Sequence, residues 1–152
     1  MQHICVHKTY SNWWHTIKSL NPDSKTSVAF WKPSLRNFSL LELGETILFN
    51  VDGKIVGGGI YREFSNNNIT PQSLWNEYGN FTGAKNLSNL LKDLNEKRTL
   101  GSEEISESSN ISYLKLSDLF WLSPSISEIF TKEFGDFPNP QNPYISKELI
   151  FK

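Results

Sequence analysis

The spacing of apolar and polar residues divides the chain into short strands and helices. Apolar residues alternate with polar ones, as in half-buried strands, over residues 3–8, 27–31, 46–64 and 111–116, with an extension over 119–122. Helical spacing predicts helices over residues 11–20, 71–78 and 85–98, and a helical turn over 126–130. The intervening residues 65–70 and 99–110 are polar, and we expect them to be loops, the second one acidic and mobile. These elements fit a single α+β domain, because a chain of 152 residues needs no second core.

The first predicted helix begins at Ser11 or Asn12, either of which suits an N-cap position, and it ends before Asn21-Pro22. Trp13 and Trp14 are adjacent in this helix. Neighbouring residues point in different directions from a helix axis, so one helix cannot turn both rings toward the same core. We therefore expect one of the two tryptophans to be partly exposed or to lie at a junction with another element.

Residues 46–64 (TILFNVDGKIVGGGIYREF) predict a β-hairpin around which the chain is organised. Asp52-Gly53 supplies the tight turn, and the second strand is interrupted by three consecutive glycines, Gly57 to Gly59. Glycine within a strand indicates a bulge that bends the sheet, or a place where another backbone or a flat ligand comes close. The two interpretations are compatible.

Composition adds many aromatic rings and one cysteine to this picture. Five Trp, five Tyr and ten Phe are more rings than a small core requires, so some are candidates for a binding surface. Cys5 is the only cysteine, which excludes an internal disulfide and suits a reducing, cytoplasmic setting. No apolar run reaches the length of a membrane span, and the N-terminus lacks a secretory leader. We therefore expect no membrane association.

The net charge of −1 gives no support to indiscriminate binding of nucleic acid, but the charges are unevenly distributed. Residues 1–36 carry five basic side chains and one acidic side chain, whereas residues 93–152 carry six basic and ten acidic ones. The N-terminal part is thus a candidate basic face for a polyanion, although ordinary solvated surfaces also show such asymmetry.

The chain lacks the common signatures of catalysis and cofactor binding. It has no nucleophile elbow, phosphate loop or dinucleotide fingerprint. Its three histidines, all within residues 1–15, have no cysteine or carboxylate partners that would complete a metal site. The glutamates of residues 99–110 read as solvated side chains of a loop. We expect a binding domain that is not an enzyme and uses no cofactor or metal.

Several segments in order carry a family resemblance. They are FWKPS (30–34), LELGETILFN (41–50), IVGGGIYREF (55–64) and SLWNEYG (73–79), followed by NFTG (80–83). This series resembles the N-terminal domain of HNH-type restriction endonucleases. There, a W-x-P-S segment precedes an L-x-x-G-E-x-x-L-F strand, a V-G-G-G strand and an A-W-x-x-x-G-x-x-N-G helix.

The resemblance implies a PUA-like β-pseudobarrel of five or six strands with flanking helices, the superfamily that includes the SRA, EVE and YTH readers of modified bases. It also implies that a catalytic HNH module follows in the full-length protein. The strand-like run over residues 144–152 stops abruptly, and we expect the natural chain to continue past it.

A reader of modified bases takes the base out of the stack, holds it against an aromatic wall and probes its edge with polar groups. The expected base pocket consists of Trp31, Lys32, Ser34, Gly58, Gly59, Tyr61, Trp75 and Tyr78. The expected phosphate contacts are Lys8, Lys18, Lys25 and Arg36. A core position is the competing interpretation for Trp31, Trp75 and Tyr78, because large aromatic side chains are mostly buried. The pocket hypothesis requires Trp31 and Tyr61 to share one open cavity.

We therefore expect a domain that recognises double-stranded DNA carrying a modified cytosine or adenine, as the targeting module of a modification-dependent restriction system. Two alternatives stay open. One is an RNA-binding PUA-like module that stacks single-stranded bases, and the other is a protein-interaction domain that uses exposed aromatics.

Overall fold

The computed structural model describes residues 4–33, 43–98, 101–134 and 144–145. Six strands and four α-helices are found in this part of the chain. The strands are β1 (Ile4–Lys8), β2 (Val28–Lys32), β3 (Thr46–Val51), β4 (Lys54–Ile69), β5 (Ile111–Trp121) and β6 (Tyr144–Ile145). The helices are α1 (Ser11–Leu20), α2 (Pro71–Tyr78), α3 (Leu87–Lys97) and α4 (Pro124–Phe134), with a 3-10 helix, η1 (Gly79–Thr82).

The strands form one sheet in the order β2-β5-β4-β3-β1-β6, in which β1 and β3 are parallel and the other neighbours are antiparallel. This confirms the expected α+β class. The sheet is not closed, since no backbone pairing joins β2 to β1 within the described residues.

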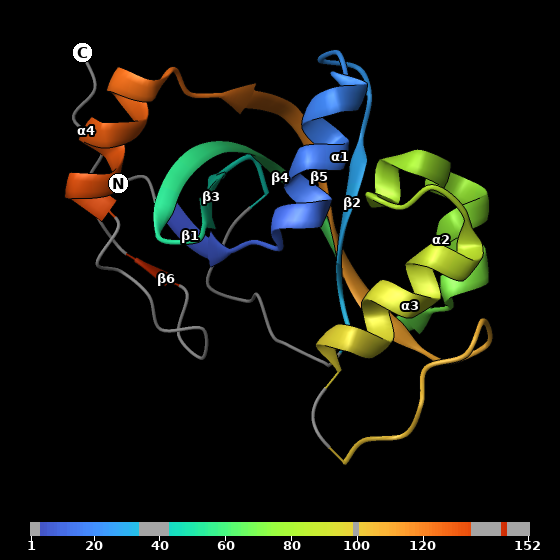
Figure 1. Ribbon diagram of the computed structural model, residues 1–152. Helices are drawn as coiled ribbons and strands as arrows, with labels where there is room; N and C mark the ends of the chain where they lie inside the picture. The colour runs from blue at the N-terminus through green and yellow to red at the C-terminus, as the bar shows by residue number, and fades with distance from the viewer. Residues whose placement is uncertain (1–3, 34–42, 99–100, 135–143, 146–152) are drawn as a thin grey trace.

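Helices cover the two faces of the sheet, and the alternation of the strands explains why (Figure 1). On β3, Ile47 and Phe49 point into the main core, which includes α1, while Leu48 lies in a second, smaller cluster with Ile4 and Val6. Helix α4 lies on the side of this second cluster. Its Ser127 hydroxyl donates to the carbonyl of Ile55, at 2.5 Å. The sheet thus has apolar contacts on both faces.

The sheet curls so that β2 approaches β1 through side chains alone. The Phe30 ring lies 5.2 Å from the His7 ring and stacks at 5.9 Å on Phe49, with an interplanar angle of 2°. The amine of Lys32 lies 3.1 Å from Nδ1 of His7. We call these contacts between β1 and β2 the seam. Side chains therefore fill the gap that backbone pairing leaves open.

Both tryptophans of α1 are buried at junctions with other elements, which confirms one of the two expected placements, and neither is partly exposed. The side chains of Trp13 and Trp14 are 3% and 2% exposed. Trp13 packs edge-on against Phe30 and donates from Nε1 to the carbonyl of Ala29, at 3.0 Å, while Trp14 packs against Trp121. The helix lies inside the curl of the sheet, which covers more of its circumference than a flat sheet would (Figure 1).

The hairpin prediction is confirmed, including the turn. Asp52 and Gly53 both have positive φ, 51° and 87°, as the two central residues of a type I′ turn require. The second strand is longer than expected: residues 65–69, predicted as part of a polar loop, continue β4. They do so because β5 pairs with them, Ser65 opposite Tyr113 and Ile69 opposite Ile111. Partner strands can impose extended structure on a polar sequence.

Candidate functional site

The start of α1, the end of β2 and the C-terminal half of α3 meet around a hollow of about 110 Å³. Its lining residues come from three separate stretches of sequence: Tyr10, Ser11, Asn12, Trp13, Trp31, Asp93, Glu96 and Lys97. The connection from β1 to α1 is fixed, because Thr9 donates its backbone N–H to the carbonyl of Asn50, at 2.8 Å. This bond holds Tyr10 at the edge of the hollow.

Aromatic rings form one wall of the hollow. Tyr10, which is partly exposed, lies 5.1 Å from Trp31 at an interplanar angle of 33°. Trp31 is itself 3% exposed, and its Nε1 donates to the carbonyl of Thr82, at 2.9 Å. The amine of Lys97 lies 4.9 Å from the centroid of the Tyr10 ring, within cation–π range. The buried Trp31 ring, fixed by its hydrogen bond, therefore packs behind the more accessible Tyr10 ring.

Backbone donors of α1 border the same hollow. Tyr10 occupies the N-cap position and makes no side-chain cap, so the predicted capping by Ser11 or Asn12 is wrong. The first turn also contains no acidic residue. The first N–H groups of a helix have no partner within the helix, and the Tyr10 side chain does not cap them. The first three residues of α1, Ser11 to Trp13, line the hollow.

Asp93 brings a carboxyl group to the hollow from α3. Partial burial raises its pKa, and nearby Glu96 raises it further, while Lys92 and Lys97 oppose the shift. In the part of the chain that the structure describes, no hydrogen bond or ion pair engages this carboxyl group. The carboxyl group is partly exposed, and its raised pKa makes it a candidate functional group of the hollow.

Of the expected pocket residues, Trp31 lines the hollow but Lys32 does not. Lys32 is 8% exposed, and its amine lies in the seam, beside His7 and 4.6 Å from the centroid of the Phe30 ring. Ser34 lies outside the described residues. The expected role of Lys32 as an exposed donor at a strand end is therefore wrong, because the curl of the sheet covers this end of β2.

Tyr61 and Trp31 do not share an open cavity, and this condition of the pocket hypothesis fails. Tyr61 is 5% exposed and pairs with Leu116 of β5, whereas Trp31 pairs with Tyr113. Leu116 and Tyr113 are three positions apart in the part of β5 that pairs regularly with β2, so they point to opposite faces. The two aromatic residues lie on different sides of β5.

The three glycines of β4 allow atoms of the neighbouring elements to pack closely against its backbone, and these atoms leave no room for a ligand. A Cβ on Gly58 would collide with the carbonyl oxygen of Ile47 and with the Phe120 ring, and one on Gly57 with Trp14. The pairing of β4 with β5 shifts register beside Gly59. The bulge interpretation is thus confirmed, and the backbone of Gly58 and Gly59 is not open to a base.

Trp75 and Tyr78 of α2 lie apart from the hollow, and the core interpretation holds for Tyr78. Tyr78 is 8% exposed, and its hydroxyl lies 3.3 Å from that of Tyr113. Burial is the main cause that raises the pKa of both phenols. Trp75 is partly buried and packs against the main core.

The expected phosphate contacts Lys8, Lys18 and Lys25 are all exposed, and Arg36 lies outside the described residues. Helix α1 carries no acidic residue. The nearest acidic residue in sequence, Asp23, is engaged locally: its carboxylate accepts from the backbone of Lys25 and from the Thr26 hydroxyl, both at 2.9 Å. These bonds lower the pKa of Asp23. The outer face of α1 and the turn after it thus present lysines with little competition.

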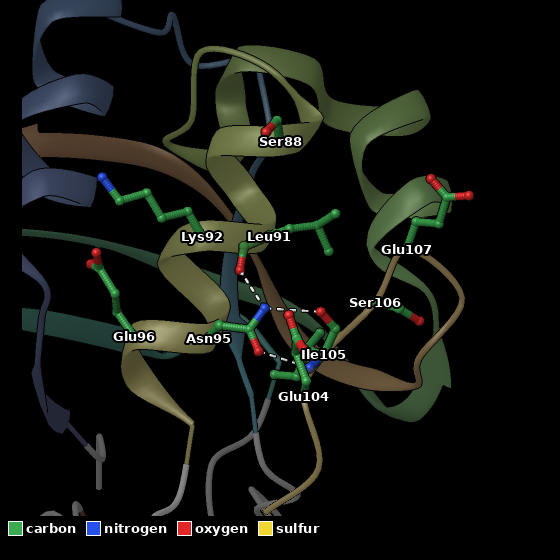
Figure 2. A pocket seen from close by; sticks show the side chains of 9 residues that line it. All are labelled: Ser88, Leu91, Lys92, Asn95, Glu96, Glu104, Ile105, Ser106 and Glu107. Carbon is green, nitrogen blue, oxygen red and sulfur yellow. Dashed lines mark hydrogen bonds between the residues drawn. The ribbon is translucent and has the colours of Figure 1, made fainter.

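A second depression, which we call the acidic groove, also borders α3 and shares Glu96 with the hollow (Figure 2). It has a volume of about 850 Å³ and lies between α3 and residues 101–110, which contain no helix or strand, as expected. Asn95 fixes its floor by donating to the carbonyl of Ile105 and accepting from the N–H of Ile105, at 2.9 and 2.8 Å. Three glutamates, Glu96, Glu104 and Glu107, line the acidic groove together with one lysine, Lys92. The excess of negative charge makes the groove unfavourable for a polyanion.

Sequence reasoning missed Tyr10, Asp93 and Lys97. Tyr10 precedes the first helix and belongs to no apolar stripe. Asp93 and Lys97 are four positions apart on α3, the spacing of residues on one helix face, but only the packing of α3 beside β2 brings them to Trp31. The only sequence signal for these two residues was a pair of charged side chains beside the apolar stripe of a helix. Such pairs are common on solvated helices and do not by themselves indicate a site.

The chain matches no protein-family model, no curated protein and no solved structure. Among the described residues, no helix has the length and apolar character needed to span a bilayer. No group of three or more His, Cys, Asp or Glu side chains in those residues is placed to hold a metal ion.

Proposed function

We propose that this chain is a non-catalytic, PUA-like domain that binds double-stranded DNA carrying a modified base. In this proposal the flipped base enters the hollow beside Tyr10, and the exposed lysines of the N-terminal part contact phosphates. The domain acts in the cytoplasm as the targeting module of a modification-dependent restriction system, alongside a nuclease module.

The observation that carries the proposal is the hollow itself. It combines an accessible aromatic ring, a lysine amine, backbone donors and a carboxyl group without a partner, which are the groups that hold and read a flipped base. Lys8 is exposed and lies two residues before Tyr10 in the sequence, which makes it a candidate phosphate contact near the site. Lys18 and Lys25 extend the basic surface to the other end of α1.

Fluorescence anisotropy of labelled duplexes tests the proposal at low salt. Wild-type protein should bind a duplex with one central modified base more tightly than the matched unmodified duplex. Tyr10→Ala should lose most of this preference, about tenfold, since stacking contributes about 1–3 kcal/mol per base. Tyr10 is a better target than Trp31, because Trp31→Ala would also remove a buried ring from the core.

Phosphate contacts predict a different pattern. Lys18→Ala and Lys25→Ala should weaken binding to modified and unmodified duplexes equally, and each should reduce the slope of log K against log salt by about 1. Lys132→Ala removes an exposed lysine from α4, on the other face of the sheet, and should leave the affinity unchanged. Equal affinity of wild-type protein for modified and unmodified duplexes would contradict the proposal.

The same titrations distinguish the alternatives. Tighter binding to single-stranded RNA would favour an RNA-binding module, and no binding of nucleic acid would favour a protein-interaction domain. For the latter, the exposed large apolar side chains in the described residues are aliphatic: Leu43, Ile126 and Ile129. The described residues therefore offer no exposed aromatic cluster for docking a protein.

A further inference from the structure

We infer that the acidic groove binds an extended segment of a partner protein, in which lysine or arginine alternates with apolar residues. This inference goes beyond the proposed function, because it concerns a second surface and does not require DNA binding. Three properties of the groove carry it: its dimensions, its apolar floor between carboxylates, and its fixed shape.

The dimensions of the acidic groove suit a short stretch of extended chain. Along α3 its lining runs from Ser88 to Glu96, which spans about 12 Å at a rise of 1.5 Å per residue. An extended chain covers this distance with about four residues, at about 3.3 Å each. The volume of about 850 Å³ also lies within the range of about 300–1,000 Å³ that holds drug-sized ligands. The groove therefore accommodates a few residues of a partner.

The floor of the groove is apolar. Leu91 is partly exposed and extends from α3 toward the opposite wall, and Ile105 lies beneath that wall (Figure 2). Covering recessed aliphatic surface with an apolar side chain removes it from water. Solvated carboxylates alone occur on many surfaces, whereas carboxylates around a recessed leucine match a ligand that is both apolar and basic. A small cation would leave the leucine uncovered.

The charges of the groove are unbalanced on the wall opposite α3. Lys92 and Glu96 are four positions apart and extend from the same side of α3, so their charges offset each other (Figure 2). On the opposite wall, Glu104 and Glu107 are exposed and make no ion pair among the described residues. The whole segment 101–110 contains three glutamates and no basic residue. A partner's cation therefore meets carboxylates without a competing lysine on this wall.

Arg98 does not neutralise these carboxylates. It donates to the carbonyl of Ser102, at 2.8 Å, and lines an adjoining pocket of about 300 Å³ together with Glu103 and Glu104. One guanidinium group beside two carboxylates leaves negative charge there as well. The negative potential therefore continues past the end of the groove.

Lysine and arginine match this lining better than other polar residues do. Their aliphatic stems cover apolar surface such as that of Leu91 while their charged ends reach the carboxylates. Successive side chains of an extended chain point to opposite sides, so an apolar residue at every second position faces the floor. The basic residues between them then lie at the rim, where Glu104 and Glu107 are exposed.

Hydrogen bonds from two helices hold the groove in shape. Asn95 of α3 bonds both backbone groups of Ile105, and the N–H of Gln72 in α2 donates to the carbonyl of Glu107, at 3.2 Å. A ligand therefore finds a wall that is already ordered, and binding costs less conformational entropy than it would on a free loop.

Anisotropy of fluorescein-labelled hexapeptides tests the inference without nucleic acid. The probe alternates lysine with leucine, one control peptide has glutamate in place of lysine, and the other has serine in place of leucine. Wild-type protein should bind the probe at low salt, the serine peptide about tenfold more weakly, and the glutamate peptide not at all. Hydrogen exchange over residues 101–110 should slow when the probe is bound, which locates the complex in the groove.

Two variants separate the ionic and the apolar contributions. Glu104→Gln combined with Glu107→Gln should weaken binding of the probe about threefold to tenfold. Leu91→Gln keeps a good helix former and should bind the probe no better than the serine peptide. The matched control, Glu63→Gln combined with Glu128→Gln, neutralises two exposed glutamates outside the groove and should bind the probe as wild type does. Circular dichroism checks that each variant is folded.

Three results of these titrations would overturn the inference: no binding of the probe by wild-type protein, equal binding of the probe and the serine peptide, or equal losses in the groove pair and the control pair. Sedimentation velocity without peptide adds a fourth. Self-association of wild-type protein that disappears in Glu104→Gln with Glu107→Gln would assign the groove to the lysines of a second copy. None of these results bears on duplex binding, so the inference and the proposed function fail separately.

Discussion

The three glycines of β4 show how a single missing Cβ sets the geometry of the sheet. A Cβ on Gly58 would meet the carbonyl oxygen of Ile47, which the β3–β4 pairing holds in place. A Cβ on Gly59 would instead meet the far end of the Leu119 side chain at 2.8 Å, and that side chain is partly exposed. The first neighbour is rigid backbone and the second is flexible.

This difference predicts unequal costs for the same substitution. Gly58→Ala should lower the free energy of unfolding by about 3 kcal/mol or more, because the strand must shift, whereas Gly59→Ala should cost about 1 kcal/mol or less. Urea unfolding followed by tryptophan fluorescence measures both. Equal losses in the two variants would show that the backbone contact at Gly58 relaxes easily.

At individual positions, the sequence predicts local backbone conformation better than it predicts how far a side chain is buried. The turn at Asp52-Gly53 was predictable because positive φ demands those residue types. The burial of Trp13 and Trp14 was not, because it depends on the curl of the sheet around α1. The same curl covers Lys32, and no local pattern encodes it. Trp31 and Tyr61 are separated by the strand pairing, which places them on different sides of β5. The residues of the hollow therefore emerged only from the packed fold.

Residues 101–110 illustrate how one side chain can order a polar element. The Asn95 amide bonds both backbone groups of Ile105, which is 9% exposed, and also donates to the carbonyl of Leu91, at 2.9 Å. Composition alone predicted a mobile loop. The structure adds this anchor at Ile105, and two more bonds hold the segment on either side of it. Arg98 donates to the carbonyl of Ser102, at 2.8 Å, and the N–H of Gln72 donates to the carbonyl of Glu107, at 3.2 Å. We therefore expect less mobility than the composition predicts.

Asn95→Ala should release this anchor. The loss leaves the N–H and carbonyl of Ile105 without these partners, which should cost about 1–2 kcal/mol and accelerate amide exchange of Ile105 about tenfold. Hydrogen–deuterium exchange measured over residues 101–110 checks it. Ser88→Ala, on the exposed surface of the same helix beside the acidic groove, should change neither quantity. Unchanged exchange in Asn95→Ala would place the anchor elsewhere.

Element types were largely predictable, and the exceptions have a common cause. Helices α1, α2 and α3 follow from apolar spacing and from end signals such as Pro71 and Gly79. The end of β4 and the full length of α4 did not follow. Residues 65–69 are extended because β5 pairs with them, and α4 is stabilised by contacts of Ser127 and Thr131 with Ile55. Partners distant in sequence determine these lengths.

At the scale of the whole molecule, charge is separated across α3. Helix α1 and the turn after it carry the exposed Lys18 and Lys25, and α1 has no acidic residue, while the acidic groove carries three glutamates and one lysine. A polyanion approaching this molecule is therefore attracted to the α1 side and repelled from the other. The hollow adjoins the acidic groove through Glu96, which lines both. If the proposed function holds, this charge distribution favours one orientation of the duplex, with Tyr10 on the side of the DNA.

The seam determines whether the curled sheet keeps this arrangement. Phe30 lies at its centre, 5.0 Å from Trp13, 5.2 Å from His7 and 5.9 Å from Phe49. Because no backbone pairing joins β2 to β1 in the described residues, these contacts and the Lys32–His7 pair substitute for it. Removing the ring should therefore both open a cavity and loosen the curl on which the hollow depends.

Phe30→Ala should lower the free energy of unfolding by about 3–5 kcal/mol, the usual cost of deleting a buried aromatic ring. Phe130→Ala removes a partly buried ring of α4 from the second cluster and should cost clearly less. Amide exchange in β1 and β2 should accelerate in Phe30→Ala beyond what global unfolding explains, since only this variant weakens the seam. If both variants lose equal stability and the exchange of β1 and β2 follows global unfolding alone, the main core and not the seam maintains the curl.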